Sequence, residues 1–236
     1  PKAIKAAGNL IVNSGRITVV TTEDGGEGLE SKSTLTINGG DLELNTYDDA
    51  INASTAIVIN GGRIYANASG NDGIDSNGTL TINGGLIISS GTTSPEEGFD
   101  CDQNQFKITG GIAIGLGGGT SSPTSSVCTQ NSAIVTVSSA SQGSLCGIID
   151  SSGNLLASFT MPKNYSRSCT MLFTHPDLEI GSSYKVMTGG SISGGDSSTE
   201  WFGYREDAAW SGGTQAGSFS QTSTVTGSSG GGGRPF

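Results

Sequence analysis

Basic residues, histidine and long apolar runs are all scarce in this chain of 236 residues. Only 11 Lys and Arg residues accompany 21 Asp and Glu, for a net charge of −10, which excludes the basic face that nucleic-acid binding requires. No run of 18 apolar residues is present, so we expect no membrane span. A single histidine and the absence of CxxC spacing argue against zinc and copper sites.

The cysteines are four in number: Cys101, Cys128, Cys146 and Cys169. An even count in an acidic chain rich in glycine, serine and threonine suits an exported protein with two disulfides. We favour a Cys146–Cys169 pair, because both residues lie in expected strands, and this leaves Cys101 with Cys128. Buried free thiols are the alternative. We expect an extracellular or cell-surface protein, and a processed or trimmed product because Pro1 lies inside a repeat.

Glycine, in contrast, is abundant, with 39 residues, and much of it belongs to a repeated Asn-Gly-Gly corner. The corner positions follow one another at steps of 25, 22, 23 and 26 residues, a period that marks a solenoid. Short runs with alternating apolar and polar residues lie between the corners and predict strands. We therefore predict an all-β fold with a parallel β-helix of about five rungs over residues 1–120. The corner residues are Asn13, Asn38, Asn60, Asn83 and Thr109.

A second motif in each rung is acidic and reads "EGLES", "DAINA", "DGIDS" and "EGFDC" in turn. The third residue is always apolar and faces the core, whereas the first is acidic and the fourth is acidic or an amide. Stacked rungs turn these positions into two columns, and two unit charges at the rung spacing repel by about 3.5 kcal/mol at an effective dielectric near 20. The predicted metal ligands are Glu27, Glu30, Asp49, Asp72, Asp75, Glu97 and Asp100.

Calcium is the cation that these columns predict, since they offer oxygen ligands without sulfur or imidazole. Lys2 and Lys5 align with the first and fourth positions and would head the columns opposite Glu27 and Glu30. The alternative is that the acidic residues are solvated surface residues that recur through duplication of the repeat.

Residues 121–236 have a different style and predict a β-rich layer that covers one side or end of the solenoid, followed by a flexible glycine-rich tail, "GSSGGGGRPF". The segment from Ser198 to Trp210 contains Trp201, Tyr204 and Trp210. These rings are candidates for stacking against sugars, or alternatively for a hydrophobic cap.

The run "INASTAIVINGGRIYANASGNDGIDSNGTLTINGG", followed by "EEGFDCD" and "GGTSSPTSS", resembles a family of secreted bacterial carbohydrate-binding proteins. The resemblance implies a right-handed, polysaccharide-lyase-like β-helix with calcium along the coil, and binding of cellulose or acidic, pectin-like polysaccharides. The acidic residues of the family's motif correspond to the seven predicted ligands given above. The four cysteines depart from the family pattern.

Three classes of function remain open from the sequence. We predict a non-catalytic binder of plant-type or acidic polysaccharide, and therefore no enzyme activity. A structural subunit that stacks head to tail into a filament is the alternative. A calcium-dependent polysaccharide lyase is the third, because Arg16, Arg63 and Lys107 are possible bases near the corners.

Overall fold

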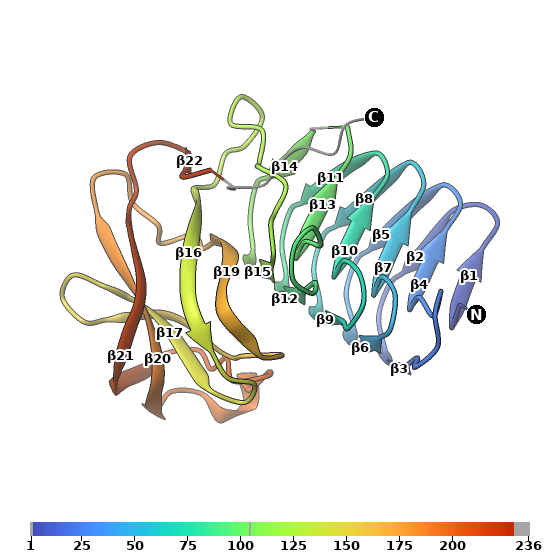
Figure 1. Cartoon of the computed structure of the whole chain (residues 1–236). Coiled ribbons are helices and arrows are strands. Elements are labelled where there is room, and N and C mark those ends of the chain that lie inside the picture. The colour runs from blue at the N-terminus through green and yellow to red at the C-terminus, as the bar shows by residue number, and fades with distance from the viewer. Residues whose placement is uncertain (1, 104, 229–236) are drawn as a thin grey trace.

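The computed structural model describes residues 2–103 and 105–228, and within these it is almost entirely β-structure, with one short 3₁₀ helix, η1 (Ser197–Thr199). Figure 1 shows two parts: a solenoid of stacked rungs at the N-terminal end and a β-sandwich beside its last rung. Most of the predicted flexible tail lies outside the described residues. Among those described, no helix is long and apolar enough to span a bilayer.

Three parallel sheets run along the solenoid, and each rung contributes one strand to each sheet. The first sheet contains β1 (Ile4–Ala6), β4 (Leu29–Ser31), β7 (Ile51–Ala53), β10 (Ile74–Ser76) and β13 (Phe99–Cys101). The second contains β2 (Leu10–Val12), β5 (Thr34–Ile37), β8 (Ala56–Ile59), β11 (Thr79–Ile82) and β14 (Phe106–Ile108). The third contains β3 (Arg16–Val20), β6 (Asp41–Thr46), β9 (Arg63–Ala68), β12 (Leu86–Ser90) and β15 (Ile112–Gly117). The predicted five-rung parallel solenoid is confirmed.

The corner residues form a hydrogen-bonded ladder between rungs. Asn38 donates to Asn13 over 2.8 Å, and the same amide-to-amide bond recurs at the next two corners, until the Thr109 hydroxyl donates to Asn83 over 2.7 Å. The glycine two positions after each corner residue adopts a positive φ, for example +102° at Gly40, a conformation that L side chains rarely tolerate. The repeat therefore sets the rung-to-rung register.

Equivalent apolar residues stack in the solenoid interior. In the first sheet, Leu29, Ile51, Ile74 and Phe99 are paired in register and are fully buried. Phe99 is larger than its counterparts, and Gly115 on β15 provides the room, since a Cβ at Gly115 would lie only 2.3 Å from the Phe99 ring.

The third sheet continues beyond the solenoid into the sandwich. Strand β15 pairs antiparallel with β19 (Tyr165–Thr174), and β19 pairs antiparallel with β16 (Ser132–Ala140). Strand β16 in turn pairs with β22 (Val225–Thr226). The opposing sheet has the order β18 (Leu155–Thr160), β17 (Leu145–Asp150), β20 (Ser183–Gly194) and β21 (Ala208–Ser220). The rungs end near the predicted boundary at residue 120, but one sheet crosses it, so the division into two domains stays a prediction.

The loop between β15 and β16 covers the last rung. The backbone N–H groups of Ser121, Thr124 and Thr129 donate to the carbonyls of Phe99, Phe106 and Ile108 over 2.9, 2.8 and 3.0 Å. These bonds satisfy groups that a sixth rung would otherwise pair. The edge strands of the first rung, β1, β2 and β3, each have a neighbour on one side only in the described chain.

The predicted disulfides are wrong in this structure, because all four cysteines are free. Cys101 lies on β13 in the first sheet and donates to the Gly78 carbonyl over 3.4 Å, whereas Cys128 packs beside the second sheet and accepts from the Ile108 N–H over 3.3 Å. Cys146 and Cys169 belong to opposite sheets of the sandwich and are buried in its apolar core. Burial raises the pKa of each to about 12, so both are packed as neutral thiols.

Candidate cation and carbohydrate sites

Two columns of polar side chains lie at the start of the first sheet. The backbone N–H groups of Ala3, Gly28, Ala50 and Gly73 donate to the carbonyls of the first-position residues, which fixes the first column. Strand pairing fixes the second. The first column is Lys2, Glu27, Asp49, Asp72 and Glu97, and the second is Lys5, Glu30, Asn52, Asp75 and Asp100. The structure thus brings all seven predicted metal ligands into two adjacent columns.

Lysines neutralise the columns at the first two rungs. Lys2 contacts Glu27 over 2.5 Å and Lys5 contacts Glu30 over 2.9 Å, as the alignment of the repeats predicts. Lys32 also binds Glu30. Although burial alone would raise the pKa of Glu30, the hydrogen bonds from Lys32 and Lys5 lower it.

The middle of the columns has no such cations. Asp49 and Asp72 are buried and Asp75 is half-buried, and none of the three forms an ion pair with Lys or Arg among the residues described. The amide of Asn52 bridges two of them, donating to Asp49 over 3.1 Å and to Asp75 over 2.6 Å. Asp49 also accepts from the Asp72 N–H over 3.1 Å.

This environment disfavours the charged form of the three aspartates. Burial, followed by the charge of Asp100 and Asp49, raises the pKa of Asp72 to about 9. Burial also raises the pKa of Asp49 and of Asp75, with added repulsion from Asp48 at the first and from Asp49 at the second. Without a cation, these surroundings therefore favour the protonated form of the three carboxyl groups.

The columns are not a preformed cage of acidic side chains. In the described part of the chain, no three His, Cys, Asp or Glu side chains converge closely enough to hold a metal ion by themselves. Amide oxygens lie beside the carboxylates, since Asn52 is within the column and Asn71 donates to Asp48 over 2.7 Å. A cation here would need amide, carbonyl, water or ligand oxygens as well as carboxylates, a mixture that Ca²⁺ accepts. The assignment of calcium stays a prediction.

The three aromatic candidates do not form one surface. Trp201 and Tyr204 are buried, at 7% and 9% exposure, and belong to a loop that packs on the solenoid, where Phe202 stacks on Tyr65 with ring centroids 3.7 Å apart. These contacts fit the alternative of a hydrophobic cap. Trp210 lies elsewhere, on β21, and is half-buried. Their binding of sugars stays a prediction.

The arginines considered as lyase bases lie on the third sheet, whereas the acidic columns flank the first. Arg63 donates to both carboxylate oxygens of Asp41, over 2.7 and 2.6 Å, and lies 4.9 Å from the centre of the Trp201 ring. Arg16 is 3.5 Å from Glu43. Lys107 is exposed on β14 in the second sheet. The columns and these basic residues therefore occupy different sides of the solenoid.

A family model described as "carbohydrate-binding domain-containing protein" matches residues 1–73 and 26–148, more than half of the chain. The chain belongs to this family. The two matched ranges start 25 residues apart, which is the spacing from Asn13 to Asn38. Searches of curated proteins and of solved structures found no match. Membership in the carbohydrate-binding domain family favours a binding role, and the matched range covers the whole solenoid but ends within β17.

Several important contacts were missed from the sequence. Lys32 follows Glu30 by two residues, and the alternation along the chain could have indicated their common face. The two hydrogen bonds that the Asn52 amide donates could be inferred from its place between two acidic rungs. No local signal indicates Lys163, whose half-buried side chain extends from the sandwich and donates to the carbonyls of Ala68 and Ser90 in the solenoid.

Proposed function

We propose that this protein is an extracellular, non-catalytic, calcium-dependent binder of acidic polysaccharide, with its site along the two columns. The observation that carries the proposal is the stack of Asp49, Asp72 and Asp75, which are buried or half-buried and, among the described residues, form no ion pair with a cationic side chain. Isolated charges in such surroundings are costly unless a counter-ion is present. A divalent cation supplies that charge.

The donor set supports calcium over other metals. Carboxylate, amide and carbonyl oxygens are hard ligands, and Ca²⁺ takes six to eight of them with flexible geometry. The seven carboxylates predicted as ligands (Glu27, Glu30, Asp49, Asp72, Asp75, Glu97 and Asp100) would share the ions with Asn52. The lysines at the first two rungs make Glu27 and Glu30 the weakest of these ligands.

The small number of carboxylates that converge on any one point of the columns also supports a polyanionic ligand. A calcium ion that the protein alone does not saturate retains positions for water or for the carboxylate of a uronic acid. A chain of uronic acids that lies along the columns would meet several ions in succession, and multivalent contact raises its affinity. The net charge of −10 would otherwise repel such a polymer, so binding should depend strictly on the cation.

The test is binding to polygalacturonate with calcium and with chelator, for the wild type and for Asp72→Asn/Asp75→Asn. We expect binding of the wild type in calcium, its loss in chelator, and at least about tenfold weaker binding of the variant, which is about 1.4 kcal/mol. Glu23→Gln/Asp24→Asn removes the same charge at two exposed positions and should bind like the wild type. Binding that is equally strong in chelator contradicts the proposal.

The other two functions remain predictions with less support. A lyase needs a base beside the bound uronic acid, and the structure engages Arg63 with Asp41 instead. Release of unsaturated sugars from polygalacturonate would reveal such activity. Head-to-tail stacking on the last rung meets the loop that covers β13 and β14, so a filament requires an acceptor edge elsewhere on the molecule.

A further inference from the structure

The outer face of the sandwich sheet β18-β17-β20-β21 carries an aromatic ring on a floor of glycine. On β17, Cys146 and Ile148 are fully buried against the sandwich core, so Gly147 between them faces outward. A Cβ at Gly147 would lie 2.6 Å from Cε3 of Trp210, and a Cβ at Gly190 on β20 would lie 2.2 Å from Cζ2. The Trp210 ring therefore extends from β21 across two neighbouring strands.

The ring is held in position but is not part of the core. Its Nε1 donates to the Gly212 carbonyl over 3.0 Å, which fixes the orientation of the indole. Trp210 is half-buried and belongs to neither of the hydrophobic core clusters of the described residues. One side of the ring thus rests on the glycines, and the ring adds little to the stability of the core.

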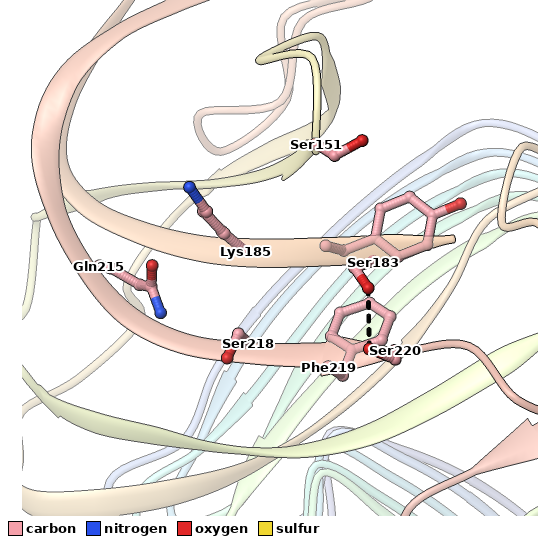
Figure 2. A pocket seen from close by; sticks show the side chains of 8 residues that line it. Ser151, Ser183, Lys185, Gln215, Ser218, Phe219 and Ser220 are labelled. Carbon is pink, nitrogen blue, oxygen red and sulfur yellow. Dashed lines mark hydrogen bonds between the residues drawn. The ribbon is translucent and has the colours of Figure 1, made fainter. Parts of the chain in front are cut away.

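Polar side chains continue the same face beside the ring. Met187 pairs with Gly147 on one side and with Gln215 on the other, and Lys185, two residues along β20, pairs with Ser218. Gln215 and Lys185 also line a pocket, which Figure 2 shows with these two side chains projecting from adjacent strands and with Ser183 hydrogen-bonded to Ser220. Among the described residues that line this pocket, Lys185 is the only charged one and none is a carboxylate.

We propose that Trp210 and this pocket form a second carbohydrate site, which binds a neutral pyranose chain without calcium. The axial C–H face of a pyranose is apolar and flat and matches an indole ring, whereas hydroxyls at its rim match Lys185, Gln215 and the serines. A polyuronate is disfavoured there, because the chain carries a net charge of −10 and the pocket offers one cation. Apart from Gly147, the residues of this site lie outside the range matched by the family model, which ends at residue 148.

The glycine floor provides a sharp variant for the test. Gly147→Ala keeps the indole but inserts a methyl group beneath it. The three atoms nearest to a Cβ at this position all belong to the Trp210 ring. Gly147 does not have a positive φ, so the backbone tolerates alanine. Trp210→Ala removes the ring. Gly8→Ala is the matched control, since a Cβ at Gly8 would meet nothing within 4 Å.

The measurement is titration with cellohexaose in chelator, followed by calorimetry and tryptophan fluorescence. We expect binding by the wild type and the Gly8→Ala variant, and about tenfold or greater weakening in Trp210→Ala. Gly147→Ala should fall between them. Fluorescence should respond to the sugar in the wild type but not in Trp210→Phe, where only the buried Trp201 remains.

The outcomes separate this site from the acidic columns. Trp210→Ala should retain calcium-dependent binding to polygalacturonate, and Asp72→Asn/Asp75→Asn should retain binding to cellohexaose. The proposal is overturned if the wild type does not bind cellohexaose, or if folded Trp210→Ala and Gly147→Ala bind it as the wild type does. Loss of polygalacturonate binding alone would contradict only the function proposed for the columns.

Discussion

The first two rungs and the middle rungs of the acidic columns offset the repulsion between stacked carboxylates in different ways. At the first two rungs, Lys2, Lys5 and Lys32 neutralise Glu27 and Glu30 within the protein. At the third and fourth rungs, Asp49, Asp72 and Asp75 have hydrogen bonds from neutral groups instead. The contrast indicates that the fold can accommodate stacked carboxylates with either lysine side chains of the protein or a bound cation. The bound cation is needed at the middle rungs.

Removal of calcium should have the largest effect on this contrast. An ion present at 1,000 times its dissociation constant stabilises the folded state by about 4 kcal/mol, and each kcal/mol shifts the melting temperature of a protein of this size by about 2–4 °C. We expect chelation to lower the melting temperature by about 10 °C in calorimetry. The Asp72→Asn/Asp75→Asn variant should lose most of this response, and Glu23→Gln/Asp24→Asn should keep it. An unchanged melting temperature of the wild type contradicts the calcium assignment.

In chelator, the change of stability with pH should have opposite signs for the middle rungs and for the first two rungs. The pKa of Asp72 rises to about 9 in the folded state, above the value of about 3.9 for an unfolded chain. The folded state then binds more protons between these values, so stability should fall as the pH rises from about 4 through 9. Glu30 has a lowered pKa, so its contribution is lost as the pH falls below about 4.5.

Thermal melts from pH 5 to 9 measure this behaviour. With chelator present we expect the melting temperature to decline across the range, by less than the effect of calcium at pH 8. Calcium should flatten or reverse the decline, because the ion replaces protons on the aspartates. A melting temperature that rises with pH in chelator would show that the middle carboxylates are well solvated anions.

Most of the solenoid was predictable because its determinants are local and repeated. The corner asparagines, their glycines and the inward apolar residue of each acidic motif recur at one period, so each rung confirms the register of the next. The placement of Glu27, Asp49 and Asp72 in one column follows from this register alone. The pKa shifts of these residues could not be predicted, since they depend on burial that no single repeat reveals.

The sandwich was predictable only as a β-rich cover. Its partners are distant in the sequence: β15 pairs with β19, and Lys163 reaches back to Ala68. Strands of this kind have no shared period, so the sequence does not specify their neighbours. The placement of Trp210 on Gly147 and Gly190 depends on three such strands, which explains why the aromatic candidates were grouped by sequence although the structure separates Trp210 from Trp201.

Loss of the Asn52 amide should have an intermediate effect. Asn52→Ala leaves Asp49 and Asp75 without their shared donor, and a buried polar group that loses its partner costs about 1–3 kcal/mol. We expect a lower melting temperature in chelator, by roughly 2–4 °C per kcal/mol, and a larger loss in calcium, since the variant then also lacks an amide oxygen that shares the ion. Equal losses in both conditions would assign Asn52 to packing alone.

The smallest effect is expected at the end with internal charges. Lys5 is half-exposed, and exposed ion pairs contribute about 0–1 kcal/mol, so Lys5→Met should change the melting temperature by only a few degrees. The double variant Lys2→Met/Lys5→Met tests the calcium response more directly. In this variant, Lys32 is the only one of the three lysines that remains to pair with Glu27 and Glu30. We expect this Lys2→Met/Lys5→Met variant to gain stabilisation by calcium relative to the wild type, measured as the difference in melting temperature with and without chelator. If the difference is unchanged, the lysines do not substitute for the cation, and the first rungs and the middle rungs are not alternative solutions to one electrostatic problem.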